Sequence, residues 1–404
     1  MSRSHQLARA CSLFLLASVH GAQGQVALSP LPVTQPLTIN EPLDEVMVAG
    51  ISRYAVRALD ESQRLRDATW EQDKADPEIY RKSVERHRSH LRTIIGAEDE
   101  REPANGFEIV AKVGRDGVVA RSADVVVYAI RWPVLPGITG EGLLLEPCKP
   151  PVARVIAIPD ADWTPEVFAG LAAGLGDHQP APSRLATAGV EVVVPTLISR
   201  DDTNSGSPLV AYTNQPHREF IYRQAFPLGR HIIGYEVEKV QAAVDQLWQL
   251  NERHNVRLPI GVTGVGEGGL LALHAAAIDP RVDAALVSGY FQTRTSVWQE
   301  PIYRNVWSLL TEFGDAEIAN LIAPRPLVIE ACAVPEVAGP PPAREGRRGG
   351  AAPGKIKTCA LDDVHSEYER ARKSYARLEA ENRFSLVASA DGAGPSSCAP
   401  ALAP

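Results

Sequence analysis

Acidic residues follow several apolar runs of the chain, at positions where side chains could do chemistry. Asp160 and Asp162 come after the run at 152–158, and Glu267 comes after the run at 258–265. Carboxylates gathered at one edge of a sheet could act as general acid and base, or hold a divalent cation. The same residues also suit helix starts, where they cap or complement the helix dipole, so both roles stay open. Glu267, Asp160 and Asp162 are the candidate catalytic residues, and whether they bind a metal is left unassigned.

A glycine run begins at Gly264 and repeats at every second position through Gly268, before an Ala-rich helical pattern at 270–278. This order predicts a strand, a sharp turn and a helix, because glycine permits positive φ and close packing. A dinucleotide site is the alternative, since Gly269 completes the G-x-G-x-x-G spacing and the acidic Asp283 follows. The run lies late in the chain, after several strand–helix units, which disfavours that alternative.

Composition limits the classes of function. The chain has 404 residues, of which 45% are hydrophobic and 22% charged, enough for one large or two ordinary domains. Its formal net charge of -8 argues against a nucleic-acid partner or an anionic membrane surface. After the N-terminal leader, no segment has the roughly 18 uninterrupted apolar residues of a membrane span. The ten histidines include no H-E-x-x-H pair, which excludes a zincin, and no cofactor is expected.

Residues 1–24 have the features of a secretory signal peptide. Arg3 and Arg9 precede a short apolar run at 10–19, and small residues follow at 22–24. We therefore expect a secreted or periplasmic protein. Residues 25–42 are Pro-rich and are expected to form a linker.

The rest of the chain has four scattered cysteines, Cys148, Cys332, Cys359 and Cys398. They lack the C-x-x-C spacing of a zinc site. An oxidising compartment would permit disulfides, and Cys332 with Cys359 is a plausible pair that brackets one loop.

The apolar patterns after the linker predict an α/β protein. Residues 43–104 are helical and charged, and we expect them to cap the main domain at 105–395. There, strand and helix patterns alternate, which predicts a mostly parallel sheet with helices on both faces. Strands are expected at 107–112, 123–131, 152–158, 190–195, 258–265, 284–288, 327–330 and 384–389. Helices are expected at 164–175, 235–250, 270–278, 306–313 and 364–382.

Two segments fall outside this alternation. Residues 335–353 are rich in Pro, Gly and Arg, and their composition favours a mobile, solvated surface loop over a basic ligand-binding lid. Residues 396–404 are rich in Ala, Pro and Ser without helical periodicity. We predict that they form a disordered tail.

The segment 261–291 resembles α/β-hydrolases of the acetyl-xylan-esterase or dienelactone-hydrolase-like kind, most specifically in the helix at 267–279. The segments 322–327 and 218–226 carry the same resemblance, which covers roughly 105–395. It implies an eight-stranded hydrolase sheet with the active site at the carboxyl ends of the strands. It also implies an ancestry in ester hydrolysis, with acylated carbohydrates or small esters as substrates.

In that family the glycine run is the nucleophile elbow, G-x-S-x-G, which exposes a serine on a strained turn. Here Gly264 and Gly268 hold the flanking positions, and Gly266 stands where the serine should be. Another serine could substitute, and Ser288 at the end of the next strand is the candidate. A serine at a strand end is more often a turn residue.

The other two members of a hydrolase triad are an acid and then a histidine. The acid could be Glu330 or Glu336, after the strand at 327–330. The histidine is expected near 389–394, where the sequence instead holds Asp391, and no histidine follows His365. The general base of the usual mechanism is therefore missing together with the nucleophile.

Two hypotheses follow from this pattern. The first is a serine-independent hydrolase, in which Glu267, Asp160 and Asp162 activate water. The second is a non-catalytic relative that binds a glycan, a peptide or a partner protein through the old pocket. Nearby basic residues are expected to form structural ion pairs around Glu219 and Glu236; they are Arg218, Arg223, Arg230 and His231.

Overall fold

A computed structural model describes residues 32–35, 38–73, 77–111, 116–205, 214–346 and 348–402. The predicted signal peptide and part of the predicted linker lie outside the described residues. The chain divides into two compact units, 1–54 and 55–404. The first unit contains the start of helix α1 (Leu43–Asp73), and the remainder of that helix belongs to the second unit.

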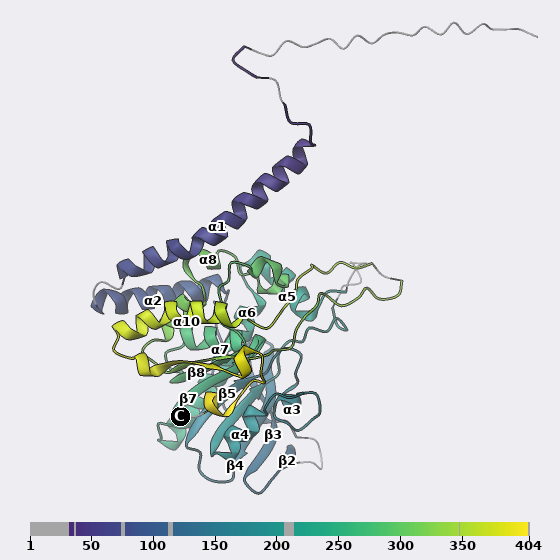
Figure 1. The fold of residues 1–404 in the computed structure, drawn as a ribbon. Helices are drawn as coiled ribbons and strands as arrows, with labels where there is room; N and C mark the ends of the chain where they lie inside the picture. The colour runs from purple at the N-terminus through teal and green to yellow at the C-terminus, as the bar shows by residue number, and fades with distance from the viewer. Residues whose placement is uncertain are drawn as a thin grey trace, which may run out of the picture. The chain divides into compact units, whose positions relative to one another are not determined.

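The second unit is built on a ten-stranded sheet with the order β1-β3-β4-β6-β5-β7-β8-β9-β10, in which β2 pairs with β3 (Figure 1). The strands are β1 (Glu108–Ile109), β2 (Val118–Arg121), β3 (Val125–Leu135), β4 (Ile138–Pro147), β5 (Ala153–Ile158), β6 (Val190–Pro195), β7 (Ile260–Val265), β8 (Ala284–Ser288), β9 (Leu327–Ala331) and β10 (Phe384–Ala388). All pairs among β5 to β10 are parallel, which confirms the expected mostly parallel sheet. The sheet has ten strands and not the expected eight, because the sequence patterns did not indicate β2 and β4.

Helices cover both faces of this sheet, as predicted. They are α2 (Pro77–Ile94), α3 (Pro165–Phe168), α4 (Ala181–Thr187), α5 (His217–Ala225), α6 (Ile232–His254), α7 (Glu267–Ile278), α8 (Leu309–Glu312), α9 (Asp315–Ile322) and α10 (Leu361–Arg377). Two short 3-10 helices also matter below, η3 (Ile302–Arg304) and η6 (Ala399–Leu402). Val192 and Val194 of β6 pack into one hydrophobic cluster with α3 and α4, whereas Val193 packs into the other with α6 and α7. This alternation is typical of a strand that is buried on both faces.

The sequence patterns miss β4, which carries two glycines in its interior. A Cβ at Gly140 would lie 2.2 Å from the ring of Trp132, and one at Gly142 would lie 2.1 Å from the carbonyl oxygen of Val194. Glycine weakens a strand pattern, because it has no side chain to pack. Close contacts with the neighbouring strands therefore explain glycines that local propensity could not interpret.

The predicted helix at 164–175 is wrong beyond Phe168. Thr164 does cap α3, and its side chain accepts a hydrogen bond from the Val167 amide. Gly170 then adopts a φ of 73°, which ends the helical path. The chain resumes helical structure only in α4, which the sequence patterns did not indicate.

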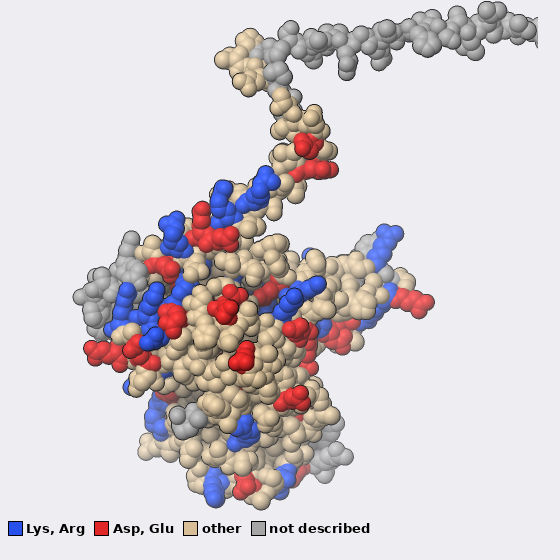
Figure 2. All heavy atoms as spheres, viewed as in Figure 1, with Lys and Arg blue, Asp and Glu red and all other residues tan. Residues whose placement is uncertain are grey.

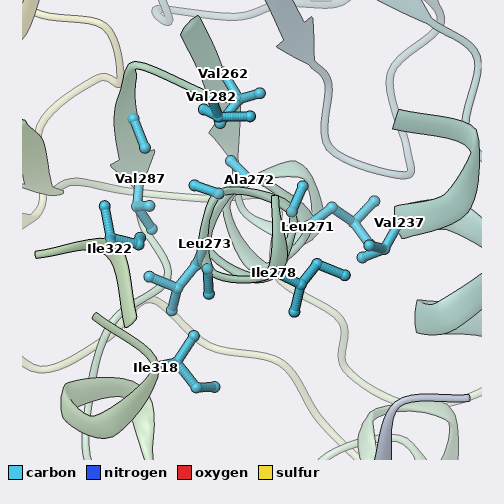
Figure 3. Close-up of a cluster of buried hydrophobic side chains, with 14 of the residues drawn as sticks. Val237, Val262, Leu271, Ala272, Leu273, Ile278, Val282, Val287, Ile318 and Ile322 are labelled. Carbon is cyan, nitrogen blue, oxygen red and sulfur yellow. The ribbon is translucent and has the colours of Figure 1, made fainter. Parts of the chain in front are cut away.

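Helix α7 is surrounded by the fold and buried at every position. Its side chains point outward in several directions, with Val237 beside Leu271 and Ile318 below Leu273 (Figure 3). A helix that is apolar all round is stable only when other elements cover all its sides. Because α7 begins at Glu267, this packing also fixes the residue that follows the glycine elbow.

The cysteines do not form the predicted bridge. Cys148, Cys332, Cys359 and Cys398 are all free thiols, so the Cys332–Cys359 pairing expected from their positions is wrong. A protein with a hydrophobic core of this size does not need disulfides for its stability.

The surface carries mixed charges. On the face drawn in Figure 2, acidic and basic side chains lie interspersed, without a wide area of one sign. A nucleic-acid interface would require a continuous basic patch. Among the described helices, none combines the length and the apolar character needed to cross a membrane.

The elbow glycines make a steric prediction. A Cβ at Gly268 would lie 2.2 Å from the carbonyl oxygen of Ile158, whereas a Cβ at Gly261, in the same strand–turn–helix unit, would meet nothing closer than 3.4 Å. Gly268→Ala should therefore lower the free energy of unfolding by about 3 kcal/mol or prevent folding, because backbone must move. Gly261→Ala should change it by less than about 1 kcal/mol. Thermal denaturation of both variants checks this, and equal melting temperatures would contradict it.

Candidate functional site

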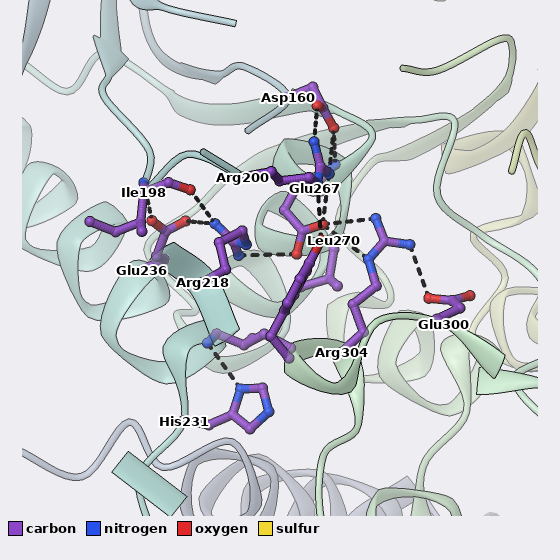
Figure 4. A network of polar contacts seen from close by, with 12 residues as sticks. Asp160, Ile198, Arg200, Arg218, His231, Glu236, Glu267, Leu270, Glu300 and Arg304 are labelled. Carbon is purple, nitrogen blue, oxygen red and sulfur yellow. Dashed lines mark hydrogen bonds and ion pairs between the residues drawn. The ribbon is translucent and has the colours of Figure 1, made fainter. Parts of the chain in front are cut away.

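The candidate residues meet where β5, β6 and β7 end. Asp160 follows β5, Arg200 follows β6, and Glu267 opens α7 after β7. All three are buried, and Figure 4 shows them joined in one polar network. Asp162 also reaches Arg200, at 3.1 Å. The expectation that these carboxylates share one sheet edge is confirmed, because parallel strands bring their carboxyl ends together.

Glu267 is held by three arginines. Its Oε1 accepts a hydrogen bond from Arg218 at 3.0 Å. Its Oε2 accepts from Arg200 at 3.1 Å and from both Nε and Nη2 of Arg304, at 3.0 and 2.8 Å. The carboxylate is 0% exposed. Its four hydrogen bonds, one to Oε1 and three to Oε2, all come from charged donors.

Each arginine also binds a second carboxylate. Arg200 binds Asp160, Arg218 binds Glu236 at 3.2 Å, and Arg304 binds Glu300 at 3.0 Å. The arginines come from three separate segments: the loop after β6, helix α5, and η3. Positive and negative groups therefore alternate outward from Glu267, and a buried ion network of this kind is tolerable because its charges are paired.

The expected structural role of the other basic residues is only partly right. Arg223 binds Glu219 at 2.8 Å, as predicted, but Arg230 binds Asp99 instead, at 2.9 Å. His231 is the N-cap of α6, and its Nδ1 accepts a hydrogen bond from the Ile233 amide.

No sequence pattern pointed to Arg304, because it lies in a short irregular segment without periodicity.

The environment of Glu267 is unfavourable for acid–base chemistry. Burial alone would raise its pKa, but the charges of Arg304, Arg218 and Arg200 outweigh burial and hold the pKa far below its usual range. A carboxylate with such a low pKa is a very weak base. The geometry therefore favours a structural role for Glu267, and its catalytic role stays a prediction.

Asp160 fills the space next to the empty nucleophile position. Its Oδ2 accepts a hydrogen bond from the Glu267 amide at 2.9 Å, and its Oδ1 accepts from the Asp162 amide at 3.1 Å. In α/β-hydrolases the amide after the nucleophile, with one from the loop after the third strand of that fold, forms the oxyanion hole. The Asp160 carboxylate therefore occupies an oxyanion-hole donor and is not free to act as a base.

The elbow itself is present and strained. Gly266 adopts φ 57° and ψ -113°, and it starts α7. A Cβ at this position would lie 2.4 Å from Oδ2 of Asp160. The side chain of a serine and the present position of the Asp160 carboxylate therefore exclude each other.

Asp162 is the most accessible of the three candidate carboxylates. Its side chain is 40% exposed and contacts Arg200 at 3.1 Å. Burial raises its pKa, although Arg200 acts in the opposite direction. It is the candidate residue that can exchange a proton with solvent.

The two candidates for the acid of the triad, Glu330 and Glu336, both accept hydrogen bonds from other parts of the fold. Glu330 lies one residue before the end of β9 with its carboxylate buried, and it accepts hydrogen bonds from Ser288 Oγ at 2.6 Å and from the amides of Ser397 and Cys398 at 2.9 and 2.8 Å. Ser288 is fully buried, which excludes it as a nucleophile for an outside substrate. Glu336 instead accepts from the Thr358 amide at 3.2 Å.

The C-terminal segment, which follows the expected position of the triad histidine, packs against the fold. Residues 396–402, predicted as a disordered tail, are ordered: Ser396 and Ser397 are buried, and η6 follows. Asp391, in the region expected to hold the histidine, is exposed and adopts a φ of 55°. The sequence could not reveal this, because the tail is ordered by Glu330, which lies far away in the chain.

The insertion at 335–353 is anchored over the site. Asn214 Oδ1 accepts from the amides of Gly350 and Ala351, Glu219 accepts from the Ala352 amide, and Val337 pairs with Ile356. The described residues at 342–346 and 348–350 are exposed, as expected of a solvated loop, and Arg344 among them binds Asp202. Residues 336–341 of the insertion line a cleft of 260 Å³ together with Asp162, Arg200, Glu219 and Tyr303.

Two other kinds of site find no support. Among the described residues, no group of three or more His, Cys, Asp and Glu side chains is arranged to hold a metal ion. The dinucleotide alternative needs Asp283 near the glycine turn, but Asp283 accepts from the Ile260 amide at 2.8 Å, at the opposite end of β7. Asp283 is therefore out of reach of any ligand at the elbow.

Comparison with known proteins supports the fold. No protein-family model and no curated protein sequence matches the chain. A solved structure of a Bacteroides fragilis protein described as an acetyl xylan esterase covers 78% of this chain and 77% of its own, at 16% identity and a TM-score of 0.55. A methylesterase (84% and 64% covered, 14% identity, TM-score 0.47) and a Solibacter usitatus glucuronoyl esterase (78% and 89%, 14%, 0.45) also match. The first similarity shows that the fold is the α/β-hydrolase fold, and at this identity it shows the fold alone.

The ion network gives a stability prediction. Glu267→Gln leaves three buried guanidinium groups around a neutral side chain, so the free energy of unfolding should fall by about 3–5 kcal/mol. Glu141→Gln is the matched control, because Glu141 pairs with Arg131 at 3.0 Å on the surface, where such pairs contribute little. Chemical denaturation of both variants at neutral pH measures the two losses, and similar losses would contradict the network's role.

The same variant should show a defined pH dependence. The pKa of Glu267 is lowered by folding, so its stabilising contribution is complete above the unfolded-state pKa, about 4.5, and is lost as the pH falls toward the folded-state pKa. The stability difference between the wild type and Glu267→Gln should stay constant from pH 7 to about 5 and shrink below that. A difference that grows on acidification would contradict the assignment.

A serine introduced at position 266 should not become a reactive nucleophile. Gly266→Ser places its Cβ against Asp160, so we expect a loss of about 1–3 kcal/mol in stability. We also expect no labelling by a fluorophosphonate, since a general base and a free oxyanion hole are missing. Mass spectrometry of the treated variant checks this, and a covalent label on the side chain introduced at position 266 would refute it.

Proposed function

We propose that the protein is a non-catalytic relative of carbohydrate esterases that binds its ligand in the remnant of the esterase cleft. The observation that carries this proposal is the hydrogen bond from the Glu267 amide to Asp160. Ester hydrolysis would need that amide for the developing oxyanion, together with a nucleophile and a base. Here the amide is occupied, the nucleophile position is Gly266, and the base is missing from the sequence after His365.

The size and lining of the cleft favour a small polar ligand group. Its volume of 260 Å³ is below that of a typical drug-sized pocket and suits one sugar residue. Asp162 and Glu336 offer hydrogen-bond acceptors, and Tyr303 offers a ring at the wall. We infer that the ligand is a glycan chain, and acetylated xylan is the first to test because of the resemblance to acetyl-xylan esterases.

Asp162 supports a second candidate function, serine-independent hydrolysis. Its side chain lines the cleft, is 40% exposed, and has a raised pKa because of its burial. These properties suit a general base that activates water. The substrate would again be an ester group carried by a carbohydrate.

One experiment separates these functions. The wild type should give no hydrolysis of an aryl acetate or of acetylated xylan above the buffer rate, and it should be retarded by acetylated xylan in affinity electrophoresis. Asp162→Asn should weaken that retardation several-fold, whereas Asp124→Asn, at an exposed turn, should not. Turnover that disappears in Asp162→Asn would establish the hydrolase instead. Folded protein with neither turnover nor retardation would overturn the glycan ligand and direct the search to peptides and proteins.

We also propose that the protein is exported. The charged, apolar and small-residue segments of 1–24 support this localisation. N-terminal sequencing of protein recovered outside the cytoplasm should give a chain that begins at Gln25. Recovery of the uncleaved chain from the cytoplasm alone would contradict export.

A further inference from the structure

A second, larger cavity lies on the helical side of the second unit. Its volume is 630 Å³, and it is lined by α1 from Ala55 to Leu65 and by the chain from Tyr290 to Thr311. Apolar side chains such as Leu59, Val306 and Leu309 supply most of the wall. A concave, mostly apolar site of this volume is typical of small-molecule binding sites. It shares no lining residue with the remnant cleft.

Two side chains of α1 bind the segment that forms the opposite wall of the cavity. Arg66 donates to the carbonyl oxygen of Leu310 at 2.8 Å and to Glu317 at 3.1 Å. Trp70 donates its indole N–H to the carbonyl oxygen of Glu312 at 2.9 Å. These bonds tie α1 to the opposite wall directly after Leu65, at the C-terminal end of the stretch that lines the cavity.

The cavity contains a buried hydrogen-bond acceptor that the protein leaves unused. His274 of α7 lines the cavity and is 1% exposed. Its Nδ1 lies 2.8 Å from the carbonyl oxygen of Leu270, so Nδ1 carries the proton and Nε2 is an acceptor. Burial lowers the pKa of His274, which keeps the ring neutral. Among the described residues, Nε2 has no hydrogen-bond partner, and neither has Oδ1 of Asn305.

The charged groups at the cavity are already neutralised. Arg294 pairs with Asp315 at 2.8 Å, and Arg304 pairs with Glu267 at 2.8 Å. Of the described residues that line the cavity, none is acidic. A cationic ligand would therefore lose its hydration without gaining a partner, which is unfavourable, whereas Nη2 of Arg294, which forms an ion pair but no hydrogen bond among the described residues, can donate to the oxygen of a hydroxyl group.

We propose that this cavity binds a neutral, largely apolar molecule that carries a hydroxyl group, whose O–H donates to Nε2 of His274. The apolar wall accommodates an aromatic or alicyclic body, and Trp298 at the rim, 55% exposed, adds a ring for it to contact. A hydroxyl satisfies an acceptor that otherwise stays buried and unpaired, which is costly. This proposal does not depend on the function proposed for the cleft.

Two matched probes test the ligand chemistry in the full chain. In titrations followed by ligand-observed NMR, 2-naphthol should bind about tenfold more tightly than 2-methoxynaphthalene, which has the same rings but no donor. His274→Phe keeps a ring and removes the acceptor, so it should abolish this preference. Equal affinity for the two probes in the wild type, or no binding of either, would overturn the proposal.

A second pair of variants tests the location. Ala58→Trp places a large side chain in the cavity and should weaken binding of 2-naphthol at least tenfold. Ala68→Trp, an exposed position on the same helix outside the cavity, should leave it unchanged. This comparison holds even if His274→Phe does not fold. Binding that survives Ala58→Trp would overturn the assignment of the cavity.

Discussion

The pairing of Glu267 with three buried arginines is the interaction on which the carboxyl end of the sheet depends. It joins the first turn of α7 to α5, to η3 and to the loop after β6, four segments far apart in the sequence. Asp160, Glu236 and Glu300 form an outer ring that balances the arginines. Because charges in a dry environment must be matched, each segment is held to a narrow range of positions.

The same network gives the carboxylates at this edge of the sheet structural partners. A general acid or base must exchange a proton during the reaction. Here Glu267 and Glu330 are fixed by donors on every side, and the C-terminal segment covers the latter. The carboxyl edge of the sheet is therefore largely buried. Of Glu267, Asp160 and Asp162, only Asp162 is in contact with solvent.

Sequence reasoning succeeded where local pattern and final environment agree. The elbow, β6 and β8 are apolar runs that end at turn residues, and both their type and their bounds were predictable. It failed where distant contacts decide the structure: Gly142 fits against β6, and the last residues of the chain become ordered on Glu330. The candidate carboxylates could be found because they follow strands. Arg304, the third arginine that binds Glu267, follows no strand and lies in no recognisable pattern. The sequence therefore suggested reactive carboxylates, whereas in the structure their charges are neutralised by arginines.

The steric exclusion between a side chain at Gly266 and the Asp160 carboxylate has an evolutionary consequence. A serine could not arise there by one substitution without a shift of that carboxylate, and replacing the aspartate first would deprive Arg200 and the Glu267 amide of a partner. Either substitution alone should therefore cost stability. A side chain at position 266 and the present Asp160 network are alternative solutions, and exchange of one for the other requires both positions to change together.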